Sequence, residues 1–121
     1  KIIAICDDYL GQTVFLDHLH DSSLRFISVY AHMVPGRMLQ PGQDLQPGEI
    51  IGTVADTTGR KNRMPGHLHL SIMQVEKSVA PQQFTWNLIC SSERSSLVDP
   101  LTVIESEMIE MRPDNHWKKL G

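Results

Sequence analysis

The sequence predicts an all-β fold, an antiparallel β-sandwich or barrel that ends in a short C-terminal helix or an irregular tail. Segments rich in β-branched and aromatic residues recur along the first 75 residues, and only short turns separate them. No stretch before residue 76 shows the apolar spacing of a helix. With 121 residues, 40% of them hydrophobic and 21% charged, the chain has the size and composition of one globular domain.

The first strands of this fold are predicted over residues 2–6, 12–18 and 24–32. Turn-forming residues at 21–23 separate the second strand from the third, which favours a hairpin. Because successive side chains of a strand alternate between its faces, Tyr30 and His32 are expected on the same face.

Glycine and proline mark the turns of the next segment. Pro-Gly steps, which favour type II turns, occur at residues 35–36, 41–42 and 47–48. Further strands are predicted over 50–54 and 67–75, with a turn at 56–59 between them. Beyond these strands we expect a short helix or an irregular excursion around Trp86.

The C-terminal part restarts with the turn residues 98–101. Ile104, Met108 and Met111 then recur with helical spacing, and Pro113 is expected to stop the helix. We therefore expect a folded core over residues 1–104 and a C-terminal tail over residues 105–121.

Charge and hydropathy exclude several classes of protein. The net charge is −3 and there is no basic cluster beyond residues 60–63, which argues against nucleic-acid binding. The longest apolar run, residues 2–6, is far shorter than the roughly 20 residues of a membrane-spanning helix. No signal peptide is visible in the sequence, which starts directly in a predicted strand, so we expect a processed product or a fragment whose beginning lies upstream. The sequence leaves open whether Cys6 and Cys90 form a disulfide.

The sharpest local signal is the segment 66–72. His67 and His69 are two residues apart in a predicted strand, so their imidazoles are expected on one face, about 6–7 Å apart along the strand. Leu68, Leu70 and Ile72 are expected to fill the core on the other face.

A third histidine, His32, closes the predicted strand 24–32. Short turns between the strands could bring it to the same cleft as His67 and His69. Imidazole binds zinc and also titrates near neutral pH, so one cluster of this kind can supply both a metal ligand and a general base.

The chain resembles the lysostaphin-like zinc endopeptidases, which cut peptide cross-links of bacterial cell walls, because its motifs occur in the same order as the motifs of that family. The resemblance covers roughly residues 1–104. It rests on residues 11–18, Tyr30-Ala31-His32-Met33, the stretch 34–52 with Pro41-Gly42-Gln43, Thr58-Gly59 followed by His67-Leu68-His69, and Val98-Asp99-Pro100-Leu101.

The resemblance implies a β-sandwich or barrel of the duplicated hybrid motif type and a zinc-dependent peptide hydrolase. It assigns His69 as a zinc ligand, His67 as the general base, and His32 as the residue that stabilises the tetrahedral intermediate. It also implies a peptide of bacterial peptidoglycan, or another peptide, as substrate, and a periplasmic, cell-envelope or secreted location.

The chain departs from the family pattern at three places. The family takes its first two zinc ligands from a His-x-x-x-Asp element, which we expect before Lys1; the nearby residues that could stand in are Asp7, Asp8, Asp17, His18 and His20. Ser71 replaces the usual acidic residue after the His-Leu-His motif. The approach to that motif, residues 60–66, is longer and more basic than usual, and this basic loop could alter the choice of substrate.

Two other functions stay open. A catalytically inactive domain of the same fold could serve as a binding or regulatory module. A phosphocarrier of similar architecture would pass phosphate between two histidines. The sequence defines neither the bond that is cleaved nor the oligomeric state.

Overall fold

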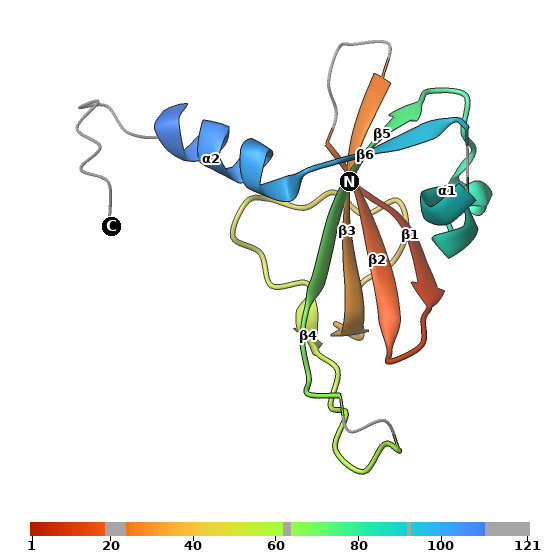
Figure 1. The fold of residues 1–121 in the computed structure, drawn as a ribbon, viewed down its shortest axis with the longest axis vertical. Coiled ribbons are helices and arrows are strands. Elements are labelled where there is room, and N and C mark those ends of the chain that lie inside the picture. The colour runs from red at the N-terminus through yellow and green to blue at the C-terminus, as the bar shows by residue number, and fades with distance from the viewer. Residues whose placement is uncertain (19–23, 62–63, 92, 111–121) are drawn as a thin grey trace.

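Figure 1 shows the computed structural model, which describes residues 1–18, 24–61, 64–91 and 93–110. The strands are β1 (Ile2–Asp7), β2 (Gln12–His18), β3 (Leu24–Pro35), β4 (Gly52–Val54), β5 (His69–Glu76) and β6 (Ser95–Val98). The helices are the 3-10 turn η1 (Pro81–Gln83), α1 (Trp86–Ser91) and α2 (Pro100–Glu110). The predicted all-β fold with a short C-terminal helix is confirmed.

All six strands join one antiparallel sheet in the order β1-β2-β3-β5-β6, with β4 paired to β3. The 12-residue β3 is the central strand, and its length lets it pair with β2 and β5 along most of its course and with β4 at its end. α2 follows β6 and extends away from the body of the sheet (Figure 1). The turn predicted at residues 21–23, and Met111 and Pro113 at the end of the predicted helix, lie outside the described residues.

Two apolar clusters cover the opposite faces of the sheet, because neighbouring residues of each strand point to opposite sides. Phe15 belongs to the larger cluster, here called the main core, and its neighbour Val14 belongs to the smaller one. The main core comprises Ile3, Phe15, Ile27, Val29, Met73, Val75, Val79, Phe84 and Leu88. The smaller cluster comprises Ile2, Val14 and Met33, with Tyr30 and Leu39 among the residues packed against it.

The start of β5 differs from the prediction. The strand begins at His69 rather than at residue 67, so the alternation expected for Leu68 does not apply, and its side chain is 47% exposed. Within the strand Ile72 is buried on one side, while Ser71, Met73 and Val75 are buried on the side of His69. The histidine side of β5 therefore continues directly into the main core, through Met73 and Val75.

Both cysteines, Cys6 and Cys90, are free thiols. Cys6 packs half-buried against the main core, and burial, with the charges of Asp8 and Asp7, raises the pKa of its thiol. None of the described helices is long and apolar enough to cross a membrane.

We predict that Gly11→Ala destabilises the fold by about 1–3 kcal/mol, because this position faces another strand's backbone. A Cβ at residue 11 would lie 2.6 Å from the carbonyl oxygen of Met33, which cannot move without disturbing β3. Urea denaturation measures the loss. Gly36→Ala is the control, since its Cβ would meet nothing closer than 3.9 Å. Equal losses for the two variants would contradict the prediction.

Candidate active site

The site is organised by an irregularity between β2 and β3. Gln12 pairs with Met33 and Val14 pairs with Tyr30, so Thr13 alone faces the two β3 residues between them, Ala31 and His32. This is a β-bulge, in which one extra residue increases the local bend of the strand. His32 has a φ of +65°, the left-handed conformation that residues other than glycine seldom adopt.

The bulge changes the direction of the His32 side chain. Tyr30 packs against the smaller cluster on one face of the sheet. The His32 ring lies near His69, which is on the main-core side of β5. The expectation that Tyr30 and His32 share a face is therefore wrong, because strict alternation stops where an extra residue enters the strand.

The three histidines of the prediction come together at this point. The ring centre of His32 lies 5.0 Å from that of His67 and 5.9 Å from that of His69, both in edge-to-face geometry. His67 precedes β5, and His69 opens the strand opposite Ala31 of β3. His32 and His67 are half-buried, whereas His69 is exposed. The expected convergence of the three rings is present, and the catalytic and metal-binding roles assigned to them stay predictions.

Behind His32 lies the carboxylate of Asp8, whose side chain is only 2% exposed. It accepts hydrogen bonds from the backbone N–H groups of Leu10, Gly11 and His32, from the Thr13 hydroxyl and from Nδ1 of His32, at 2.7–3.0 Å. Burial opposes ionisation of Asp8, but the bonds from His32, Thr13 and Leu10 outweigh it and hold the pKa of this carboxyl well below its ordinary value. Asp8 is therefore a buried, ionised and fully hydrogen-bonded group.

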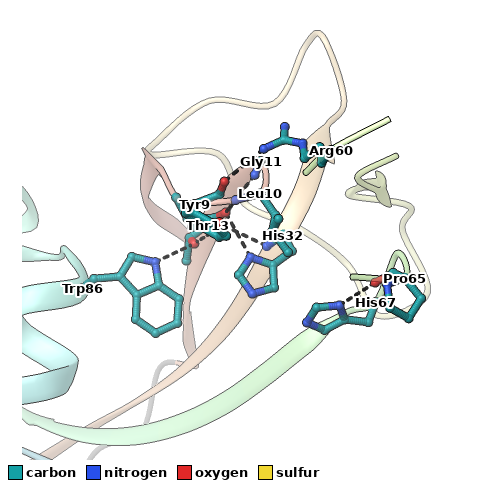
Figure 2. A network of polar contacts seen from close by, with 10 residues as sticks. Tyr9, Leu10, Gly11, Thr13, His32, Arg60, Pro65, His67 and Trp86 are labelled. Carbon is teal, nitrogen blue, oxygen red and sulfur yellow. Dashed lines mark hydrogen bonds and ion pairs between the residues drawn. The ribbon is translucent and has the colours of Figure 1, made fainter. Parts of the chain in front are cut away.

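Trp86 forms a wall of the site beside Thr13 (Figure 2). Its Nε1–H donates to the Thr13 hydroxyl at 3.0 Å, and that hydroxyl donates to Asp8 at 2.7 Å. The indole ring lies 5.7 Å from the ring of His69. Sequence reasoning did not place Thr13 or Trp86 in the site. Asp8 carried one usable signal, since an aspartate three residues before a glycine is typical of a side-chain-capped turn.

Two of the imidazoles have their tautomers set by their partners. An ionised carboxylate and a carbonyl oxygen can only accept hydrogen bonds. Nδ1 of His32, at 3.0 Å from Asp8, and Nδ1 of His67, at 2.9 Å from the carbonyl oxygen of Pro65, must therefore carry protons. In the neutral rings the lone pair then lies on Nε2, the nitrogen that can accept a proton.

The basic loop before the histidine motif lies against the same turn as Asp8. Arg60 donates to the carbonyl oxygen of Tyr9 at 3.1 Å, and Figure 2 shows both beside the site. Residues 62–63 of this loop lie outside the described residues. Ser71, which stands where the family carries an acidic residue, is buried on β5 opposite Val29.

The residues present do not by themselves fit a zinc site, which takes about three protein ligands. Over the described ranges no group of three or more His, Cys, Asp or Glu side chains could hold a metal ion. The residues that could replace the two missing zinc ligands have other partners. Asp8 is fully hydrogen-bonded, Asp17 pairs with Arg25 at 2.9 Å, and His18 bonds to Ser28 at 2.6 Å. Asp7 accepts a hydrogen bond from Gln12, and His20 lies outside the described residues.

Comparison with known proteins gives one match. The model of Peptidase family M23 matches residues 1–81, a range that contains Asp8 and all three histidines but ends before Trp86. No curated protein and no solved structure matches the chain.

We predict that Thr13→Val lowers stability by about 1–3 kcal/mol, because it leaves the Trp86 Nε1–H without its acceptor in a partly buried site. The same replacement at exposed Thr53 should change stability by less than about 0.5 kcal/mol. Thermal denaturation of the two variants tests the difference. A Thr13→Val protein as stable as the wild type would show that the hydroxyl does not hold this network.

We predict that Asp8 contributes to acid unfolding. Its pKa is lower in the folded chain than its ordinary value of 3.8, so its contribution is complete above that pH and is lost as the pH falls toward the folded-state pKa. Urea midpoints measured between about pH 5 and pH 2 should fall less steeply in Asp8→Asn than in the wild type. Asp7→Asn, which leaves the Asp8 bonds in place, is the control. An unchanged slope in Asp8→Asn would refute the prediction.

Proposed function

Since the chain belongs to peptidase family M23, we propose that it acts as a zinc-dependent endopeptidase on peptide bonds of bacterial cell-wall peptidoglycan. The observation that carries the proposal is the convergence of His32 of β3 with His67 and His69, which lie just before and at the start of β5, far away in the sequence. That substrate lies outside the cytoplasmic membrane, so the proposal includes a periplasmic, cell-envelope or secreted location.

In this proposal His32 and His67 do the proton chemistry. Each is expected to present Nε2 as the basic nitrogen, because an acceptor-only partner holds the proton on Nδ1. His67, which is half-buried near the surface, takes a proton from the attacking water. His32, held more firmly in the bulge, faces the position where charge develops on the carbonyl oxygen and stabilises it once protonated.

His69 is the proposed metal ligand, as the family resemblance assigns it. The described residues supply no set of three ligands, so we assign no catalytic step to the metal. Zinc content is therefore a separate measurement. A binding or regulatory module of the same fold is the second candidate, because such a domain needs neither the metal nor proton transfer.

We predict that the natural protein binds zinc stoichiometrically and releases new amino termini from purified peptidoglycan. His69→Ala should lose both zinc and hydrolysis. His67→Ala should keep its zinc and lose about 10²–10⁴-fold in rate, the usual contribution of a general base. Elemental analysis measures the zinc content, and amine release measures hydrolysis.

His18→Ala is the matched control, because His18 lies at the end of β2 and bonds to Ser28 rather than to the cluster. It should retain both zinc and activity. Full zinc and full hydrolysis in His69→Ala would show that the ligand is wrongly assigned. A folded wild-type protein without zinc or hydrolysis would favour the binding module.

A further inference from the structure

Asp8 is a buried carboxylate that the proposed chemistry does not use. Its side chain is 2% exposed, and five hydrogen bonds converge on its two oxygens. Burying a charge away from water is unfavourable unless hydrogen-bond donors replace the lost water. A buried carboxylate therefore needs donors that the fold arranges around it. Here the donors come from the β1–β2 turn, from β2 and from the bulge of β3.

Two of the five bonds come from one residue, His32, which lies 24 positions further along the chain. Oδ2 accepts the backbone N–H of His32 at 2.8 Å, and Oδ1 binds Nδ1 of its ring at 3.0 Å. The first bond stabilises the bulge, where His32 has its sparsely populated positive φ. The second fixes the rotation of the ring.

The other three bonds hold Asp8 itself. Oδ1 accepts the N–H groups of Leu10 and Gly11, which close the turn around the carboxylate. Oδ2 accepts the hydroxyl of Thr13, which in turn accepts Trp86 Nε1–H. Asp8 is therefore fixed in position by its own turn and, through Thr13, by Trp86. A carboxylate that is fixed in this way can in turn fix the position of His32.

We propose that Asp8 is a positioning residue for His32: it holds the bulged backbone and fixes the ring in the tautomer with the proton on Nδ1. In an imidazole ring the second nitrogen then points away from the carboxylate, so Nε2 is directed from Asp8 toward the space shared with His67 and His69. The catalytic meaning of this role rests on the proposed function; the orientation itself does not.

The first test uses the chain as it is, residues 1–121 labelled with ¹⁵N-histidine, and needs neither metal nor substrate. Long-range ¹H–¹⁵N correlation spectra distinguish a protonated from an unprotonated ring nitrogen. We expect His32 at neutral pH to show a protonated Nδ1 and an unprotonated Nε2 whenever its ring is neutral. A proton on Nε2 of neutral His32 would overturn the proposal, whatever the behaviour of any variant.

The second test compares Asp8→Ala with Asp7→Ala, the neighbouring carboxylate, which is exposed and bonds to Gln12 instead. In Asp8→Ala the His32 nitrogen signals should change to a mixture of tautomers, whereas Asp7→Ala should give the wild-type pattern. Asp8→Asn should keep a protonated Nδ1, because an amide oxygen can take the place of Oδ1. A folded Asp8→Ala protein with the wild-type His32 spectrum would contradict the proposal.

Kinetics on the active natural protein give a third readout. Asp8→Ala should lower kcat by about 10²-fold, the effect of a misplaced catalytic group, with KM changed by less than about threefold. Asp8→Asn should recover part of the loss. A rise in KM with kcat unchanged would contradict the proposal. Failure of peptide hydrolysis in the wild type would count against the proposed function and leave the tautomer result standing.

Discussion

The arrangement of the site depends on one extra residue in β3. Thr13 of β2 faces both Ala31 and His32, and this mismatch turns the His32 ring from the side of Tyr30 to the side of the main core. Without the bulge, alternation would place the ring on the other face of the sheet, away from His67 and His69. The left-handed backbone at His32 is unfavourable on its own. The buried carboxylate of Asp8 accounts for its stability by bonding to both the backbone and the ring.

The sequence predicted what depends on local pattern. Alternating apolar residues and Pro-Gly turns predicted the antiparallel sheet, and the ordered motifs predicted which histidines would meet. It failed where the pattern breaks. Tyr30 and His32 were assigned to one face because a bulge has no signature in a run of β-forming residues. Leu68 was assigned to the core because the pattern does not show that the strand begins at His69, two residues later than predicted.

The network behind the histidines was beyond sequence reasoning for a different physical reason. Asp8 and His32 are 24 residues apart, and Thr13 and Trp86 are 73 apart, so no periodicity connects the members of either pair. These contacts depend on how the β1–β2 turn folds over the bulge and on where α1 packs against the sheet. Such distances are fixed by tertiary packing, and a single sequence contains only the residue types that make them possible.

Trp86 stands on a short helix outside residues 1–81, the range that matches the family, yet its ring lies beside His69. The wall of the site and its histidines therefore belong to separate parts of the chain. α1 contacts the main core through Leu88 and reaches the histidine network through the Trp86 ring beside His69 and the hydrogen bond to the Thr13 hydroxyl. Substitutions in this helix can reshape the space beside His69 without altering the register of any strand. The shape of the site beside His69 can therefore change while the sheet that carries the histidines is retained.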